Sequence, residues 1–206
     1  LDIDSPYPLP EKDILEEKPE NCRVLQIKNP ILTSLELMQI RNMKRPGFKV
    51  ETVSLLYYKN ASLKNAVDRL FVECDRAYRD GANVIILSDR GVDEYHMAIP
   101  SLLAVSAIEH YLVRTKKRTA VSIILESAEP RDVHHFATLL GYGARAINPY
   151  LAQECVAELV EKNRLDKDVY QAIHDYNAAV LHGIVKIASK MGISTLQSYQ
   201  SAQIFE

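Results

Sequence analysis

Cysteine is scarce in this chain, and its scarcity removes two classes of protein from consideration. Cys22, Cys74 and Cys155 stand far apart in a chain of 206 residues. An odd number of cysteines at such wide spacing forms neither a disulfide framework nor the paired motifs of zinc or iron–sulfur sites. We therefore expect free thiols in a reducing, cytoplasmic setting, and no metal site in this chain.

Long apolar runs and a strong charge of one sign are missing as well. No stretch is long enough to cross a bilayer, and we expect no signal peptide before the fold. The formal net charge is −2 and the sequence pI is about 6.3. Such a balance gives no general attraction for nucleic acid or for anionic membranes. We expect neither as a partner.

The chain divides into a connector and one α/β domain. Residues 1–21 are rich in proline and acidic side chains, which predicts an extended connector. Residues 22–206 form the domain. Because the chain starts at Leu1 rather than Met and stops at Glu206 without a closing loop, we expect it to be an excised part of a longer polypeptide.

Strands and helices alternate through this domain. The predicted strands are residues 23–27, 48–58, 83–88, 119–125, 143–147 and 192–196. The predicted helices are residues 34–43, 63–79, 100–113, 133–140, 151–162 and 167–191. This alternation predicts a parallel α/β fold built of βα repeats. The strands are fewer than the eight of a closed (β/α)8 barrel, so a partial or degenerate barrel and an open sheet both fit.

Polar side chains gather where the predicted strands end, which is the edge at which α/β folds bind ligands. Asp89 and Arg90 follow one buried strand, Glu126 ends the next, and Asn148 follows a third. Glu126 could act as a general base, with His134 or His135 from the following helix as a second acid–base group. Asp89 and Arg90 could bind a substrate carboxylate or position a loop. The alternative is that Asp89 and Arg90 shape a turn and that His134 is structural. We favour this alternative, because turns routinely use Asp and a catalytic histidine needs partners.

The string Gly141-Tyr142-Gly143 superficially matches a glycine-rich phosphate loop. It follows a predicted helix and precedes a predicted strand, whereas phosphate cradles lie between a strand and the start of a helix. We interpret these glycines as the end of a helix. The residues alone predict no cofactor and assign no reaction.

Several longer strings resemble the large (alpha) subunit of glutamate synthase. They are NPILT, ILSDRG, IPSLLAVSA, LLGYGARAINPY and SKMGISTLQSYQSAQIF. The resemblance runs in order from Asn29 to the end of the chain. It identifies residues 22–206 as the central domain, between the glutamine amidotransferase domain and the FMN-binding domain, with the C-terminal end leading towards the FMN domain.

This resemblance implies a part in glutamate biosynthesis and nitrogen assimilation. The family enzyme is an oxidoreductase that releases ammonia from glutamine and conducts it through a tunnel. It adds the ammonia to 2-oxoglutarate and reduces the resulting 2-iminoglutarate on FMN. Electrons arrive through iron–sulfur clusters, from ferredoxin or from a small NAD(P)H-oxidising subunit. The central domain is similar to a degenerate barrel of the FMN-linked oxidoreductases, joins the two catalytic domains and helps to form the ammonia tunnel.

No catalytic, cofactor-binding or metal-binding residue of the family maps onto this chain, so we expect the isolated domain to be inactive. The resemblance assigns Asp89, Arg90, Glu126, His134 and Asn148 to an inter-domain or tunnel surface. The competing hypothesis is an autonomous α/β enzyme, or a flavin- or small-molecule-binding module, that uses these strand-end residues.

Two positions depart from the family pattern. Ala128 and Ser201 stand where the family usually has glycine, in ESGEP and SYxGAQ. A side chain at either position could alter a tight turn. The departures weaken any argument for a close approach of backbone and ligand at these two positions.

Overall fold

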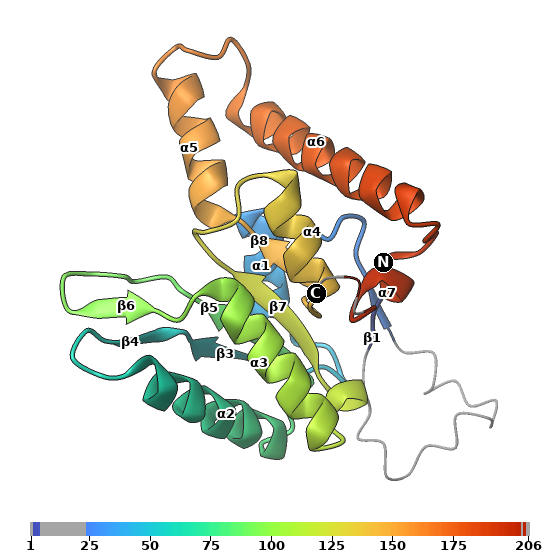
Figure 1. Cartoon of the computed structure of the whole chain (residues 1–206). Helices are drawn as coiled ribbons and strands as arrows, with labels where there is room; N and C mark the ends of the chain where they lie inside the picture. Colours follow the sequence, from blue (N-terminus) through green and yellow to red (C-terminus); the bar gives the residue numbers. More distant parts are fainter. Residues whose placement is uncertain (1, 5–23, 203, 205–206) are drawn as a thin grey trace.

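A four-stranded parallel sheet forms the centre of the computed structural model, which describes residues 2–4, 24–202 and 204 (Figure 1). In spatial order its strands are β3 (Val50–Ser54), β5 (Val84–Ser88), β7 (Ser122–Glu126) and β8 (Ala146–Asn148). Every residue of β5 and β7 is buried, as their continuous apolar sequences predict for parallel strands covered on both faces. The register places Ser88, Glu126 and Asn148 side by side. We call this side of the sheet the carboxyl edge.

Helices cover both faces of the sheet. They are α1 (Ser34–Arg41), α2 (Leu63–Arg79), α3 (Ser101–Arg114) and α4 (Val133–Gly141). Three of them, α2, α3 and α4, pack with Leu87 and Leu125 in the main apolar core. The opposite face is covered by α1, whose Leu37 packs with Ile86 in a second apolar cluster. The two alternating sets of side chains on each strand therefore both find apolar partners.

Two further helices, α5 (Tyr150–Glu161) and α6 (Val169–Lys190), extend beyond the sheet, and α6 packs against both α4 and α5 (Figure 1). The approach of α6 to α4 is close at Gly183. A Cβ atom at this position would lie 2.5 Å from Cγ2 of Val133. Glycine is therefore required here for packing and not for backbone conformation.

Polar side chains cap the starts of several helices, and α1 is capped by Thr33. Its hydroxyl accepts from the Glu36 N–H at 3.2 Å, while the Glu36 carboxylate accepts from the Thr33 N–H at 2.8 Å. This reciprocal pair is a capping box. Ser62, Asp132 and Asp168 cap α2, α4 and α6 through a side-chain oxygen that accepts from backbone N–H groups of the first turn.

The predicted strand 48–58 is divided in the structure. It becomes β3 and a short strand β4 (Leu56–Tyr58), separated by the fully buried Leu55. Strand β4 leaves the parallel sheet and pairs antiparallel with β6 (His96–Ala98), a strand that the sequence analysis did not predict. The guanidinium of Arg69 donates to the carbonyls of Ser54 and Leu56 at this division. The change of partner explains why one continuous β pattern yields two strands.

The outermost predicted strands do not join the parallel sheet. Strand β2 (Val24–Gln26) pairs antiparallel with β1 (Asp2–Asp4), which lies in the predicted connector. The remainder of that connector, residues 5–21, lies outside the described residues. The strand predicted at 192–196 is wrong: Gly192 has φ +71, and Thr195 caps a short helix, α7 (Leu196–Tyr199). Gly192 lies just after the end of α6, and Thr195 begins the next helix, so this segment has no room for a strand.

The first part of the domain lies beside the last parallel strand. Ile31 and Ile147 form a parallel bridge, with the Leu32 N–H donating to the Ile147 carbonyl and the Ile147 N–H to the Pro30 carbonyl, both at 2.8 Å. First and last strands also meet in a closed (β/α)8 barrel. In the described part of the chain, however, no strand pairs with the outer edge of β3. The prediction of a parallel α/β fold is confirmed, and the described strands do not close into a complete barrel.

The contact between α4 and α6 gives a stability prediction. Replacing a helical glycine by alanine normally stabilises a helix by about 1 kcal/mol. We expect Gly183→Ala instead to destabilise the fold by about 1–3 kcal/mol, because the new methyl group overlaps Val133. Urea unfolding measures the change. The double variant Gly183→Ala/Val133→Ala should recover part of the loss, and additive effects of the two substitutions would contradict this packing account.

Candidate functional site

A buried carboxylate, Glu126, organises the carboxyl edge. Its side chain is 3% exposed, and its Oε2 accepts from Ser88 Oγ at 2.6 Å and from an Nη of Arg41 at 2.7 Å. The other oxygen, Oε1, accepts from Arg90 Nε at 2.8 Å. Burial by itself would raise the pKa of Glu126, but the hydrogen bonds from Ser88 and Arg90 and the charge of Arg41 hold this pKa below its ordinary value. A carboxylate in this state is a weak general base.

Arg90 extends the ion pair towards α5. Its guanidinium lies 3.9 Å from the ring centre of Tyr150, and its Nη1 is 3.3 Å from Oε1 of Glu154. The guanidinium thus combines ion pairs on two sides with a cation–π contact on its face. Arg90 remains partly exposed, with 41% of its side chain accessible.

Asp89 contacts a different part of the chain from Arg90 and closes a neighbouring turn. It is 3% exposed and accepts from Ser127 Oγ at 2.6 Å and from the Ala128 N–H at 3.0 Å. Tyr150 lies against this turn, and burial together with a hydrogen bond to Asp89 raises the pKa of the Tyr150 hydroxyl. Asp89 therefore shapes the exit from β7, which agrees with the structural alternative for this residue.

An amide network fixes the third strand end. Asn148, which is fully buried, donates through Nδ2 to the Leu32 carbonyl at 2.9 Å. Gln153 of α5 donates to the same carbonyl at 2.9 Å and to Oδ1 of Asn177 at 3.2 Å. Asn177 belongs to α6, so the network joins the segment at Leu32 to α5 and α6. Its members satisfy buried backbone groups, which is a structural use of polar side chains.

His134 does not belong to this group. It is exposed in the first turn of α4, where its backbone N–H donates to the capping carboxylate of Asp132 at 2.9 Å. The adjacent His135 is half-buried, as two neighbouring helical residues must occupy different faces. The structure thus brings together Asp89, Arg90, Glu126 and Asn148 and leaves His134 apart.

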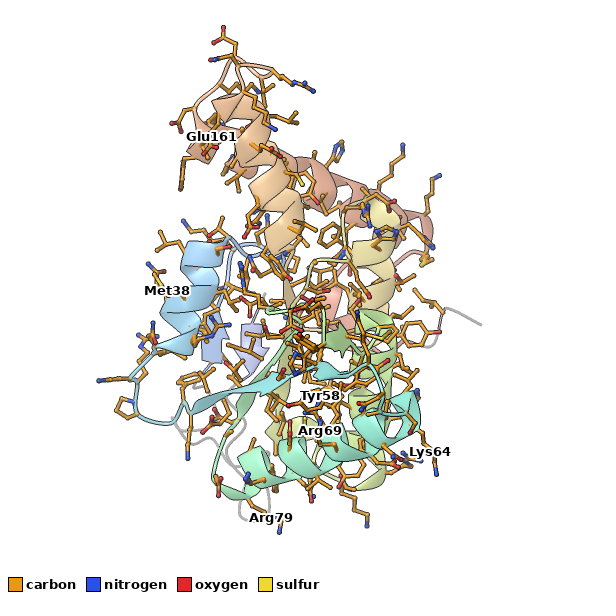
Figure 2. The ribbon with its side chains drawn as sticks, turned by 90° about the vertical axis from the view of Figure 1, so that its left-hand side faces the viewer. Met38, Tyr58, Lys64, Arg69, Arg79 and Glu161 are labelled. Carbon is orange, nitrogen blue, oxygen red and sulfur yellow. The ribbon has the colours of Figure 1, made fainter. Side chains whose placement is uncertain are left out.

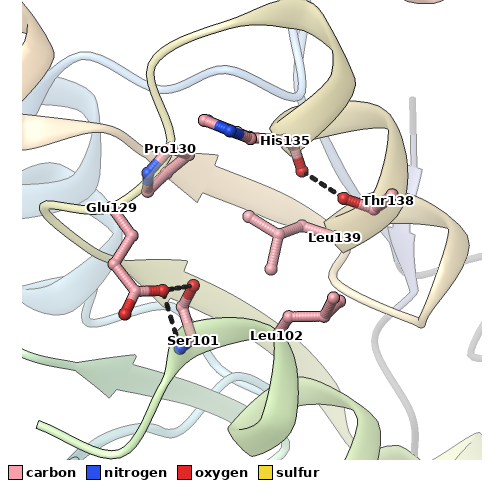
Figure 3. Close-up of a pocket in the computed structure, with 7 residues that line it drawn as sticks. All are labelled: Ser101, Leu102, Glu129, Pro130, His135, Thr138 and Leu139. Carbon is pink, nitrogen blue, oxygen red and sulfur yellow. Dashed lines mark hydrogen bonds between the residues drawn. The ribbon is translucent and has the colours of Figure 1, made fainter.

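Two hollows lie near the carboxyl edge. The smaller, of about 290 Å³, is lined by Ser101, Leu102, Glu129, Pro130, His135, Thr138 and Leu139 (Figure 3). Within it Glu129 accepts from the Ser101 N–H at 2.9 Å and from the Ser101 hydroxyl. The larger hollow, of about 530 Å³, lies where Thr33, Leu35, Gln153, Tyr170 and Asn177 meet.

The helix starts beside these hollows already carry anions of the protein itself. Glu129 occupies the N–H group at the start of α3, and Asp132 accepts from the N–H groups of His134 and His135 at the start of α4. A flavin or nucleotide phosphate needs such groups free. Among the described residues no cluster of His, Cys, Asp and Glu is arranged to hold a metal ion. No described helix has the length and hydrophobicity to cross a membrane.

Sequence reasoning missed several members of the site. Arg41, Gln153 and Asn177 were not singled out, because their partners lie far away along the chain. Arg41 contacts Glu126 across 85 positions and Gln153 contacts Leu32 across 121. The only local signal was a polar residue within an apolar helical pattern at Gln153 and Asn177, both of which are buried.

The Glu126 network gives a prediction for stability against pH. Because its folded-state pKa lies below the ordinary value of 4.5, its contribution is present above pH 4.5 and is lost as the pH falls through the folded pKa. We expect Glu126→Gln to cost about 1–3 kcal/mol at neutral pH. The cost should shrink below pH 4.5 in urea unfolding. The matched control is Glu154→Gln, because the side chain of Glu154 is 57% exposed. A cost that does not change with pH would contradict this account.

Comparison with solved structures identifies a similar fold. A mutant of flavocytochrome b2, solved with benzoylformate, aligns with a TM-score of 0.53 at 9% sequence identity. The alignment covers 69% of this chain and 38% of the flavocytochrome chain. At this identity the likeness concerns the fold alone.

Sequence comparison gives closer relatives. The chain is 40% identical to the NADPH glutamate synthase large chain of Bacillus subtilis over 95% of its length, and 41% identical to the NADH glutamate synthase of Schizosaccharomyces pombe over 96%. It spans only 13% and 10% of those two proteins. Ferredoxin-dependent glutamate synthase 2 of Synechocystis is 40% identical over 94% of this chain. A family model described as the glutamate synthase central domain matches residues 9–206. The chain therefore belongs to the glutamate synthase central domain family.

Proposed function

We propose that this chain connects the glutamine amidotransferase and FMN-binding domains of a glutamate synthase and helps to form the tunnel for ammonia. The observation that carries the proposal is the state of the carboxyl edge. In an enzyme of this fold class the edge presents reactive groups to a substrate, whereas here Asp89, Glu126 and Asn148 are each at most 3% exposed and bound to other parts of the chain. The polar side chains of the carboxyl edge hold neighbouring strands, turns and helices together.

The degenerate-barrel interpretation belongs to this proposal. The likeness to flavocytochrome b2, with a TM-score of 0.53, and the pairing of Ile31 with Ile147 support descent from a (β/α)8 barrel. In such a descendant α1 has come to cover the sheet face that would line the barrel interior. A covered interior leaves the remaining outer surfaces for contacts with neighbouring domains.

Cofactors and redox partners are assigned to the rest of the polypeptide and its complex. FMN and iron–sulfur clusters are needed for the whole reaction, and electrons would come from ferredoxin or from a small NAD(P)H-oxidising subunit. The relatives' names include NADPH, NADH and ferredoxin forms. The acidic caps at the starts of α3 and α4 support a chain that does not itself bind the FMN phosphate. A cytoplasmic enzyme fits the free thiols of Cys74 and Cys155.

The five sequence-predicted residues take different parts in the proposed surface. Arg90 presents its partly exposed guanidinium to a neighbouring domain or to the tunnel. The buried side chains of Asp89, Glu126 and Asn148 hold together the elements that meet at the carboxyl edge. His134, exposed on α4, would contact a neighbouring domain at a separate place.

An autonomous enzyme or flavin-binding module is the less favoured function. It requires Glu126 as a base with His134 near it, yet the carboxylate is engaged by three donors and the histidine lies outside the cluster. No observation on the carboxyl edge favours this alternative.

The proposal predicts that Arg90 affects the coupling of the two half-reactions. In the full-length enzyme, we expect Arg90→Ala to lower glutamine-dependent glutamate formation several-fold while glutamine hydrolysis continues, because ammonia escapes from a disturbed inter-domain surface. Measuring both products together with bound FMN separates coupling from cofactor loss. Arg79→Ala, at a side chain 69% exposed on α2, is the control and should change neither activity.

Two outcomes would contradict the proposal. One is an equal fall of glutamine hydrolysis and glutamate formation in Arg90→Ala with FMN retained. The other is a loss of FMN confined to this variant, which would place the flavin on this edge and favour the alternative function.

A further inference from the structure

A short two-stranded ribbon projects from the carboxyl edge. It consists of β4 and β6 and the loop of residues 89–95 that leads into β6 (Figure 1). Its base is anchored by Leu55 and Ile99, both fully buried, with the Ile99 N–H donating to the Leu55 carbonyl at 2.9 Å. Beyond this base the ribbon extends outward from the sheet.

Large apolar side chains are exposed on this ribbon. Tyr58 and Tyr95 are each 62% exposed, Val92 is 58% exposed and Met97 is 43% exposed. We call these four residues the ribbon tip. Figure 2 views the molecule from this side and labels Tyr58. Tyrosine and methionine are enriched at protein interfaces, and an isolated two-stranded ribbon has little stability of its own in water. Contact with another surface would therefore stabilise the ribbon tip by burying its apolar side chains.

The ribbon tip is held in one conformation before any contact forms. Asp93 accepts at 2.8 Å from the N–H groups of Tyr95 and His96 and also lies 2.8 Å from Nδ1 of His96. The Lys59 N–H donates to the Tyr95 carbonyl at 3.0 Å, and the rings of Tyr58 and His96 have centroids 4.5 Å apart. Because the backbone of the loop and the ring of Tyr58 are held in this way, the ribbon loses less freedom on association and is preorganised for binding.

The position of the ribbon indicates what covers it. Arg90 begins the loop to β6 and also pairs with Glu126, so the ribbon is continuous with the carboxyl edge. The chain spans 10–13% of the related glutamate synthases, which leaves most of such a polypeptide to pack around it. We propose that the ribbon tip docks into a mainly apolar recess on the neighbouring domain of the same polypeptide that covers the carboxyl edge. This inference rests on the proposed connecting function and names its contact surface.

Hydroxyl-radical footprinting of the full-length enzyme tests the docking directly. Oxidation of Tyr58, Tyr95 and Met97 is compared in the native and the urea-unfolded enzyme, so that each residue serves as its own reference. We expect native labelling of all three to be reduced several-fold below that of side chains about half exposed, because docking buries them. Native labelling of Tyr58 and Tyr95 at the level of exposed side chains would overturn the inference.

A pair of variants provides the second measurement. Tyr95→Ala in the full-length enzyme should increase native labelling of Tyr58 and Met97 several-fold and speed proteolysis within residues 89–95, because the docked contact is weakened. Tyr170→Ala, at a tyrosine 73% exposed on α6, is the matched control and should change neither readout. No difference between the two variants would contradict docking at the ribbon.

The outcomes separate this inference from the proposed function. An unprotected ribbon in an enzyme that makes glutamate from glutamine overturns the docking and leaves the connecting function intact. A protected ribbon in a full-length chain without that activity supports the docking and overturns the function. Protection that is lost on dilution would assign the recess to a second copy and overturn the intramolecular partner.

Discussion

The ion pair between the buried Glu126 and two arginines is the interaction on which the rest of the structure depends. It joins β7 to α1 through Arg41 and to the exit of β5 through Arg90, and Arg90 continues to Tyr150 and Glu154 of α5. A single buried charge left without these partners would cost several kcal/mol. The network therefore couples the carboxyl edge to α1 on one face of the sheet and to α5 beyond it.

The same edge supports the proposed connecting role. Asp89 closes the turn after β7, and the Asn148–Gln153–Asn177 network binds the carbonyls of Ile31 and Leu32. Glu129 and Asp132 occupy helix starts that could otherwise bind an anion. Asp89, Glu126 and the amide nitrogen of Asn148 thus each bind another part of the chain, while Asn148 Oδ1 is buried without a hydrogen-bond partner among the described residues. What remains for outside contacts is Arg90 and the ribbon beside it.

The parts predictable from sequence are those that local patterns determine. Helical spacing located α2 and α6, continuous apolar runs located β5 and β7, and their parallel register brought Asp89, Arg90, Glu126 and Asn148 to one edge.

The strand predicted at 192–196 failed because a helix end and a Thr195 cap imitate alternation. The position of His134 away from this group and the contact of Arg41 with Glu126 could not be predicted, because helix facing and long-range pairing depend on packing. Ser201, at a family glycine, has φ +57 and donates to Glu109 at 2.7 Å, so its side chain gains a partner in a turn suited to glycine.

A density map of the full-length enzyme tests the central claim most directly. If this chain connects domains and performs no chemistry, the map will show other parts of the polypeptide packed against the carboxyl edge, with Arg90 in the contact. Flavin density will then lie elsewhere. A flavin or substrate bound against Asp89 and Glu126, or an edge open to bulk solvent in the assembled enzyme, would contradict the account.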